Sequence, residues 1–272
     1  MTERIQHLKA IVLDWAGTTV DHGSRAPAIV MQEIYRRRGI DITMAQARGP
    51  MGMAKRDHIA AIAALPEITQ AWKSQFGHEC SEADIDAMYA DFLPLQKQVL
   101  KDHALVIDGI PEAIARCRDM GLKIGSSTGY TRELMEIVTP SAREQGYEPD
   151  CVLCVEDAPR GRPAPYLLFE AAKRLDVYPM WAIVKVDDTP VGIEAGRNAG
   201  CWTVGITRTG NCVGLSADEA ASLPEKELNE LCSAAADKLK AAGAHDVLES
   251  VADLPDLLTK IERRLSQGDL PF

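Results

Sequence analysis

Residues 8–19 read LKAIVLDWAGTT. The run from Leu8 to Leu13 is short and mostly apolar, which is typical of a strand buried in a parallel sheet. Gly17 then permits a tight turn after the strand. We therefore expect Asp14 at the carboxyl end of a first strand, although this stretch alone is also compatible with an ordinary turn or helix-cap carboxylate.

Short apolar runs recur along the chain and alternate with helix-like stretches. The further strand candidates are residues 122–126, 151–155, 181–186 and 202–206. The helix candidates among them are residues 111–120, 131–145, 165–175 and 193–199. This alternation indicates an α/β fold with a doubly wound, Rossmann-like parallel sheet.

Residues 22–103 break the alternation. Helical patterns cover residues 26–38, 55–64, 68–76 and 82–101, without a convincing strand among them. We expect an all-helical cap domain at 22–103, inserted into a core domain made of residues 1–21 and 104–272. Because the chain would cross between the two near residues 21–24 and 102–106, the cap could act as a lid. Helical patterns at 225–242 and 254–265 are interpreted as structural.

The composition narrows the classes of function. A formal net charge of −10 argues against nucleic acid or an anionic membrane as the main partner, but a locally positive pocket could still bind a small anion. Residues 1–9 are polar, and no apolar run approaches the roughly 20 residues of a membrane helix, so neither a secretory signal nor a membrane span is expected. Seven irregularly spaced cysteines suit a reducing compartment, and we expect a cytoplasmic protein.

Cys151 and Cys154 form a C-x-x-C motif. Such a pair could be a redox couple or half of a zinc site. Their apolar neighbours and the lack of a second C-x-x-C in the sequence favour buried thiols within a strand instead.

Polar residues follow the predicted strands where ligands bind in a doubly wound sheet. These residues are Asp14, Thr128 with Gly129, Arg162 and Asp188. A carboxylate can attack phosphorus, hydroxyl and backbone N–H groups can hold phosphate oxygens, and a guanidinium can bind them in a bidentate manner. Asp14 and Asp188 together could bind Mg²⁺, which prefers oxygen ligands.

Each of these residues also has a simpler interpretation. Thr128 could cap the helix that starts near residue 131, and Arg162 could be a solvated surface charge. Asp187 and Asp188 could serve turn chemistry alone. The four pieces together, in this chain order, favour a phosphoryl-transfer hydrolase with Asp14 as its nucleophile.

The order Asp-x-x-Gly-Thr-Thr, Thr-Gly, basic-Pro and Asp-Asp-Thr resembles the haloacid-dehalogenase superfamily of aspartate-nucleophile hydrolases. The resemblance implies Mg²⁺ bound by Asp14, Asp188 and the backbone carbonyl of Ala16. Two departures stand out. Superfamily phosphatases and mutases usually carry a proton-donating acid where Ala16 stands. Many members also carry an acid at the position of Gly192, for which Asp187 or Glu194 could compensate.

Five stretches resemble the phosphonoacetaldehyde hydrolase family more closely. They are DWAGTTVD at 14–21, MGMAKRDH at 51–58, STGYTRE at 127–133, GRPAP at 161–165 and GRNAGCWTVG at 196–205. The resemblance implies cleavage of phosphonoacetaldehyde into acetaldehyde and phosphate, with Lys55 forming a Schiff base to the aldehyde. It also implies a homodimer through the cap, where Ile29, Val30 and Ile34 could either form the interface or pack the cap's own core.

The chemistry explains why Ala16 and Lys55 occur together. Breaking a C–P bond leaves electrons on carbon, and an iminium one bond away can absorb them, so an acid at position 16 is not needed. Lys55 must be neutral to attack a carbonyl, and enclosure under a cap would favour that form. Without the resemblance, Lys55 would be interpreted as an exposed helix lysine.

Three further residues are expected around the substrate. His58, three residues after Lys55, could shuttle its proton, or it could have a helix-surface or capping role. Met51 could pack over the substrate and Tyr130 could line the pocket, or both could belong to the core. Ser24 falls near the cap hinge, and its role stays open. The rival functions are a phosphatase or mutase acting on a small phosphate ester, and a non-catalytic binding protein.

Overall fold

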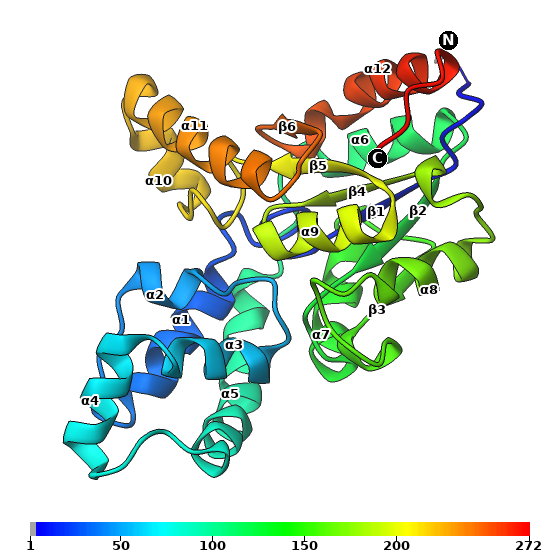
Figure 1. The fold of residues 1–272 in the computed structure, drawn as a ribbon. Helices are drawn as coiled ribbons and strands as arrows, with labels where there is room; N and C mark the ends of the chain where they lie inside the picture. The colour runs from blue at the N-terminus through cyan, green and yellow to red at the C-terminus, as the bar shows by residue number, and fades with distance from the viewer. Residues whose placement is uncertain (1–3) are drawn as a thin grey trace.

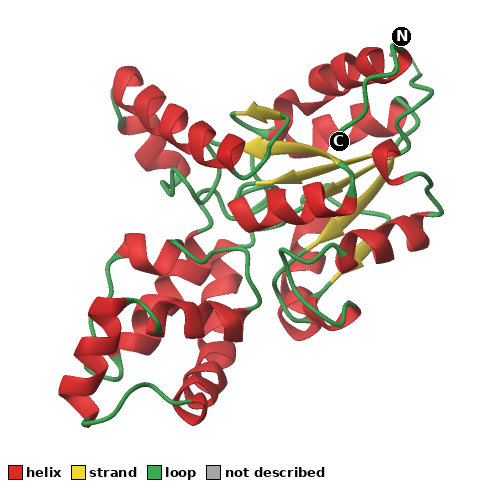
Figure 2. Cartoon of the chain, in the orientation of Figure 1, coloured by secondary structure: helices red, strands yellow, loops and turns green. Residues whose placement is uncertain are grey.

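Six parallel strands form the centre of the core, in the order β3-β2-β1-β4-β5-β6 (Figures 1 and 2). The strands of this computed structural model, which describes residues 4–272, are β1 (Ala10–Leu13), β2 (Lys123–Ser127), β3 (Cys151–Leu153), β4 (Ile183–Asp187), β5 (Trp202–Ile206) and β6 (Asp246–Leu248). This strand order is that of a doubly wound sheet whose direction of winding reverses between β1 and β4. The predicted fold class is confirmed.

Helices cover both faces of the sheet (Figure 1). On one face, α8 (Tyr166–Leu175), α9 (Pro190–Ala199) and α11 (Glu225–Ala241) contact the strands. On the other lie α6 (Ile110–Asp119), α7 (Arg132–Glu144) and α12 (Leu254–Ser266). Alternate residues of β1 point to the two helix layers. Val12 packs with α8 and α9, while Leu13 packs with α6 and α12. The fully buried β1 is the reason that its sequence is continuously apolar.

A separate bundle of helices lies beside the carboxyl ends of the strands (Figure 1). It consists of α1 (Arg25–Arg36), α2 (Met44–Arg48), α3 (Lys55–Ala63), α4 (Pro66–Phe76) and α5 (Glu82–His103). These helices have a hydrophobic core of their own, to which Val30, Ile34, Trp72 and Phe92 belong. We refer to this bundle as the cap; the side chains of Val30 and Ile34 therefore pack inside it.

Two chain segments that join the cap to the core run side by side. Val20 and Val106 form an antiparallel bridge, and the backbone N–H of Asp21 donates to the carbonyl of Leu105 at 3.0 Å. Asp21 also pairs with His103 Nδ1 at 3.2 Å. We propose that the domains divide here, into a cap at 22–103 and a core at 1–21 and 104–272; residues 1–3 of that core lie outside the described part of the chain.

Several elements differ from those predicted. The helices α2 and α10 (Ala217–Ser222) and the edge strand β6 were not predicted, because each is too short to show a periodic pattern. The apolar run at 151–155 is a strand only to Leu153, and a 3₁₀ turn covers Val155–Asp157.

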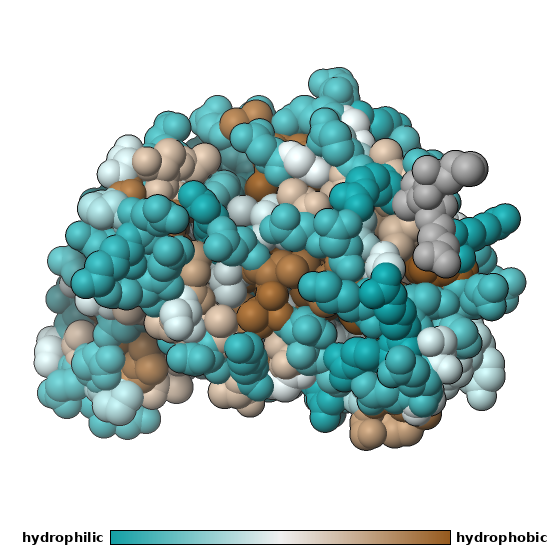
Figure 3. All heavy atoms as spheres, turned by 90° about the horizontal axis from the view of Figure 1, so that it is seen from above, coloured by the Kyte–Doolittle hydropathy of each residue, from teal (hydrophilic) through white to brown (hydrophobic). Residues whose placement is uncertain are grey.

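The cysteines match the sequence-based expectation only in part, because Cys151 lies in β3 but is partly buried, whereas Cys154 is buried but follows the strand. The face seen in Figure 3 is largely hydrophilic, with apolar side chains in scattered patches. Within residues 4–272, none of the helices is both long and apolar enough to cross a membrane. Cys151 and Cys154 carry free thiols, and burial raises the pKa of Cys154 to about 11, which makes a reactive thiolate unfavourable.

Candidate active site

The carboxyl ends of β1 and β4 bring three carboxylates together. The two strands are parallel neighbours, with Leu13 opposite Val186, so Asp14 and Asp187 leave the sheet at the same edge. Oxygens of Asp14, Asp187 and Asp188 all lie within 4.8 Å of one another. This is the point at which the winding of the sheet reverses, where open α/β folds bind their ligands.

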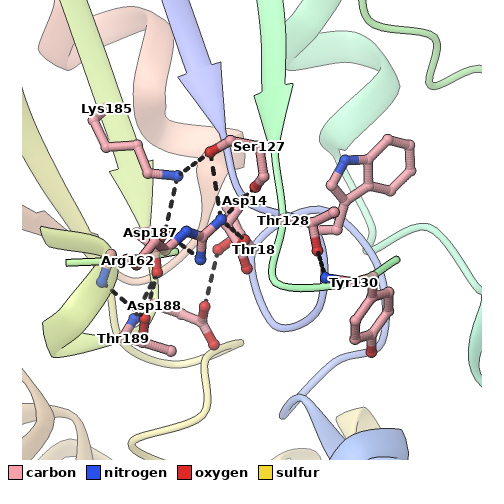
Figure 4. Close-up of polar contacts among 12 residues, drawn as sticks. Asp14, Thr18, Ser127, Thr128, Tyr130, Arg162, Lys185, Asp187, Asp188 and Thr189 are labelled. Carbon is pink, nitrogen blue, oxygen red and sulfur yellow. Dashed lines mark hydrogen bonds and ion pairs between the residues drawn. The ribbon is translucent and has the colours of Figure 1, made fainter. Parts of the chain in front are cut away.

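Arg162 anchors this group from the loop before α8 (Figure 4). Its Nη2 donates to Asp14 Oδ1 at 2.5 Å and to the carbonyl of Ser127, and its Nη1 lies 3.2 Å from Asp187 Oδ2. Its side chain is 3% exposed, so the interpretation as a surface charge is wrong. Burial opposes its charge, but Asp14 and Asp187 outweigh this effect and raise its pKa. The guanidinium is therefore a fixed cation beside Asp14.

Two hydrogen bonds hold the side chain of Asp188 in place, and a glycine leaves room for it. Thr18 Oγ1 donates to its Oδ1 at 3.2 Å, and the backbone N–H of Asn211 donates to its Oδ2 at 2.7 Å. Gly17 has a φ of +83°, and a Cβ there would lie 2.1 Å from Asp188 Oδ2. The glycine predicted to serve the turn thus also makes room for the carboxylate.

The charges of this cluster fit a divalent cation. Burial, followed by repulsion from Asp14 and Asp187, raises the pKa of Asp188 well above its usual range. Burial and Asp187 likewise raise the pKa of Asp14, against the effect of Arg162. A cation among these oxygens would offset the repulsion, and carboxylate oxygens are ligands that hard divalent ions prefer.

Lys185 is a second buried cation at this edge. It projects from the middle of β4, and its Nζ lies 2.8 Å from Asp187 Oδ2 and 3.2 Å from Ser127 Oγ (Figure 4). The sequence-based reasoning missed it. A lone lysine in the apolar run IVKVD, on a strand buried on both faces, is the signal that could have revealed it, because such a charge needs a partner.

Thr128 and Gly129 form a loop directly after β2. The backbone N–H of Tyr130 donates to Thr128 Oγ1 at 3.1 Å, whereas the cap of α7 is Thr131, whose hydroxyl accepts from Leu134. Thr128 is therefore not the helix cap. A Cβ at Gly129 would lie 2.9 Å from the carbonyl of Met53, which shows how closely the cap approaches this loop.

Lys55 enters the site from the first turn of α3 in the cap. Its side chain is buried, with Nζ 4.0 Å from Met51 Sδ and 5.3 Å from the centre of the Tyr130 ring. Burial, aided by Arg162 and opposed by Asp14, lowers the pKa of Lys55 to about 8. An exposed helix lysine is therefore the wrong interpretation, and about one tenth of this amine is neutral at pH 7, far more than for an ordinary lysine.

His58 lies behind Lys55 rather than at the cavity. Its Nε2 is 2.8 Å from the carbonyl of Ala47, and because a carbonyl only accepts, Nε2 carries the proton. Nδ1 is buried and has no hydrogen-bond partner within residues 4–272. Burial and the nearby Lys55 lower the pKa of His58 to about 3, so the imidazole is neutral with a free lone pair on Nδ1.

The cap closes over a cavity of about 20 Å³. This is room for about one water molecule, so the structure represents a closed state that must open to admit a substrate. Its lining contains most of the predicted site residues, but not His58 or Asp188. The lining residues are Asp14, Ala16, Ser24, Pro27, Met51, Gly52, Lys55, Thr128, Gly129, Tyr130, Arg162 and Thr189.

Arg48 of the cap binds the core loop that follows β5. Its guanidinium donates to the carbonyls of Gly23 and Gly214 and to Asn211 Oδ1, at 2.6, 3.0 and 3.0 Å. Asn211 is the residue whose backbone N–H holds Asp188. Cap closure and the carboxylate cluster therefore share one loop. Sequence-based reasoning missed both Arg48 and Asn211, because their role depends on contacts between residues far apart in the chain.

The fold and this site define a haloacid dehalogenase-like hydrolase, and a family model of that description matches residues 8–200. The phosphonoacetaldehyde hydrolase of Paraburkholderia phytofirmans is 45% identical over 267 residues, covering 98% of this chain and 100% of the relative. That of Bacillus cereus is 42% identical over 257 residues, covering 94% and 97%. The crystal structure of a phosphonoacetaldehyde hydrolase-like protein from Oleispira antarctica matches with a TM-score of 0.96 at 38% identity, covering 100% of this chain and 98% of that one. The chain belongs to the phosphonoacetaldehyde hydrolase family.

Proposed function

We propose that this enzyme hydrolyses the C–P bond of phosphonoacetaldehyde to give acetaldehyde and phosphate. The observation that carries the proposal is that Lys55, a buried amine with a lowered pKa, shares one small cavity with Asp14 and Ala16. A phosphate-ester hydrolase needs a proton donor near the leaving oxygen and has no use for a neutral amine there. The amine of Lys55 and the lack of an acid at Ala16 together suit a reaction in which the leaving atom is carbon.

The first step prepares the leaving group. The neutral Lys55 amine attacks the aldehyde carbon, and loss of water gives an iminium ion. The lowered pKa of Lys55 supplies the neutral amine. His58 has a pKa of about 3 and lies outside the cavity lining, so it is too weak a base to take up the amine proton near pH 7. Met51 and Tyr130, which flank the Lys55 Nζ, exclude water from the Schiff base.

The second step transfers the phosphoryl group. A carboxylate oxygen of Asp14 attacks phosphorus, the C–P bond breaks, and its electrons move to the iminium nitrogen to leave an enamine. Thr128, Gly129 and Arg162 bind the phosphoryl oxygens and stabilise the charge that they carry. Protonation and hydrolysis of the enamine release acetaldehyde from Lys55, and water hydrolyses the aspartyl phosphate.

We assign Mg²⁺ as the metal, bound by the carboxylates of Asp14 and Asp188 and by the backbone carbonyl of Ala16. The repulsion among the buried acids supports a divalent cation at this place. When bound, Mg²⁺ neutralises charge on the phosphoryl group and reduces its repulsion of Asp14. The small cavity supports action on a small molecule, and the free cysteines of the chain support action in the reducing cytoplasm.

We also propose a homodimer formed through the cap. Ile29, Leu95 and Val99 lie along a groove of about 440 Å³ between α1 and α5. They are only partly buried in one copy of the chain, so a second copy could cover them. Val30 and Ile34, in contrast, pack in the core of the cap.

Phosphate release tests the function directly. The purified enzyme should release phosphate and acetaldehyde in equal amounts from phosphonoacetaldehyde when Mg²⁺ is present, and should lose this activity when the metal is chelated. Small phosphate esters, assayed under the same conditions, should be poor substrates. Faster turnover of an ester than of phosphonoacetaldehyde would favour a phosphatase or mutase and refute the proposal.

A further inference from the structure

The first segment that joins the cap to the core has an unusual backbone, at the place where the chain passes between the two (Figure 1). Asp21, Gly23 and Ser24 have positive φ values of 54°, 83° and 49°. This left-handed region is unfavourable for a residue with a Cβ, so Asp21 and Ser24 need other contacts to hold the shape. A few residues of this kind absorb the change in backbone angles when a lid moves.

Asp21 joins this segment to the core and to the first helix of the cap. Its carbonyl accepts from the backbone N–H groups of Gly17 and Ser24, at 3.1 and 2.7 Å. Gly17 belongs to the turn that makes room for Asp188, and Ser24 lines the active-site cavity. The Oδ2 of Asp21 accepts from the backbone N–H of Ala26, in the first turn of α1, at 2.9 Å. Asp21 therefore links the carboxylate cluster to the cap without lining the cavity itself.

His103 brings the second segment to the same carboxylate. It is the last residue of α5, and its Nδ1 lies 3.2 Å from Asp21 Oδ1. Because a carboxylate oxygen only accepts, Nδ1 is the donor whether the ring is charged or neutral. The side chain of Asp21 is 2% exposed and that of His103 is 28% exposed. The acid is thus enclosed, while the imidazole can exchange protons with the solvent.

His103 faces a hollow of about 610 Å³ beside the two joining segments. The hydrogen bond to Asp21 raises the pKa of His103 above its ordinary value of 6.5, burial opposes this rise, and the charges of Asp21 and Asp102 add to it. The imidazole therefore loses its charge at a pH above 6.5. The other charged or titratable groups that line the hollow come from both segments, the loop after β5 and α10, and they are His22, Arg25, Asp102, Asp108, Arg208 and Asp218.

We propose that Asp21 and His103 form a latch at the hinge, which holds the cap closed most firmly when the imidazole is protonated. The backbone of Asp21 is bonded to the core turn, whereas its carboxylate is bonded to the start of α1 and to the end of α5. A rotation of the cap against the core must therefore disturb these contacts. Asp21 and His103 are positioning residues, and the latch does not depend on which substrate the enzyme cleaves.

The effect of pH on the latch has a definite direction. A hydrogen bond between two charged groups is stronger than one in which a partner is neutral. Because the pKa of His103 is raised in the folded protein, the extra stability is fully present below about pH 6.5. It is lost as the pH rises through the raised pKa, so the closed state should weaken with increasing pH.

The test compares His103→Gln with the wild type between pH 6 and pH 9. Glutamine can still donate a hydrogen bond to Asp21, but it carries no titratable charge. At pH 6 its kcat/KM for phosphonoacetaldehyde should be about three- to tenfold below that of the wild type, and the ratio should approach one at pH 9. Taking the ratio removes the titration of Lys55, which both enzymes share. His7→Gln, which removes a similar pair with Glu262 in the core, should match the wild type at every pH.

Small-angle X-ray scattering of the substrate-free enzyme tests the latch without the reaction. The radius of gyration of the wild type should increase between pH 6 and pH 9, whereas His103→Gln should have the larger value at both. Asp21→Asn keeps the shape of the side chain but removes its charge, so it should behave like His103→Gln, and the double variant should lose little more than either single variant.

A ratio of kcat/KM that stays flat with pH, or radii that are equal in the wild type and both variants at pH 6, would overturn the latch. If the wild type does not cleave phosphonoacetaldehyde, the proposed function fails, and the scattering experiment alone then decides whether the latch exists.

Discussion

At Gly52 the closed cap lies so close to the core that there is no room for a side chain. It lies in the loop before α3 with a φ of +92°, and a Cβ there would lie 2.4 Å from Thr189 Oγ1 and 2.6 Å from Val191 Cγ2. Thr189 cannot easily yield, because its hydroxyl is bonded to Asp187 Oδ1 and to the backbone N–H of Gly192. We therefore predict that Gly52→Ala selectively disfavours the closed state.

The expected magnitude has two parts. An alanine at positive φ costs about 1 kcal/mol whether the cap is open or closed. The overlap with Thr189 and Val191 arises only on closure and should cost about 1–3 kcal/mol, as overpacking does elsewhere. Only this second part affects closure, so kcat/KM for phosphonoacetaldehyde should fall by about 5- to 150-fold.

Gly77→Ala provides the matched control. Gly77 ends α4 in the cap with a φ of +79°, but a Cβ there would meet nothing within 4 Å. Both variants should lose similar stability in urea unfolding, and only Gly52→Ala should lose activity. If the two variants show equal kcat/KM, closure does not depend on the contact at Gly52 and the reasoning is wrong.

Three further predictions concern the site itself. For Lys55, the pKa of about 8 means that roughly one amine in ten is neutral at pH 7, against about one in three thousand for an ordinary lysine. Its labelling by a small aldehyde and borohydride should therefore rise with pH and level off at about pH 9, one unit above the pKa. A rise that continues to pH 10 would contradict the effect of burial on this amine. Asp14→Asn should abolish phosphate release while Lys55 can still be trapped by substrate and borohydride; surviving turnover would remove Asp14 from the nucleophile role. Arg48→Ala removes two hydrogen bonds to the core, to Asn211 and Gly214, and should lower kcat/KM by about tenfold or more. Arg36→Ala, which removes an exposed pair with Glu33, should not lower it; equal effects would show that Arg48 does not hold the cap closed.

Much of the fold could be predicted from the pattern of apolar residues along the sequence. The run before Asp14 is buried on both faces of the sheet, and such strands are continuously apolar, which made β1 recognisable. In contrast, β6 consists of three partly buried residues at the sheet edge, and α2 has only five residues. Elements this short are stabilised by tertiary packing, which local patterns do not reveal.

The site was predictable to the extent that its residues directly follow strands or begin helices. Asp14, Arg162 and Asp188 lie together as expected, because parallel strands end at one edge of the sheet. Lys185 and Asn211 were missed because their importance comes from partners far away in the sequence. The place of a residue in the sequence does not show which distant residues it contacts in the fold.

The amine of Lys55 is the group on which the proposed reaction depends most. Incubation of the wild-type enzyme with phosphonoacetaldehyde and borohydride should inactivate it and add the mass of a reduced two-carbon adduct to the peptide that contains Lys55. Lys55→Arg keeps the positive charge but cannot form the iminium, and it should be inactive and unlabelled. A label on another lysine, or turnover near the wild-type rate in the Lys55→Arg variant, would contradict the account.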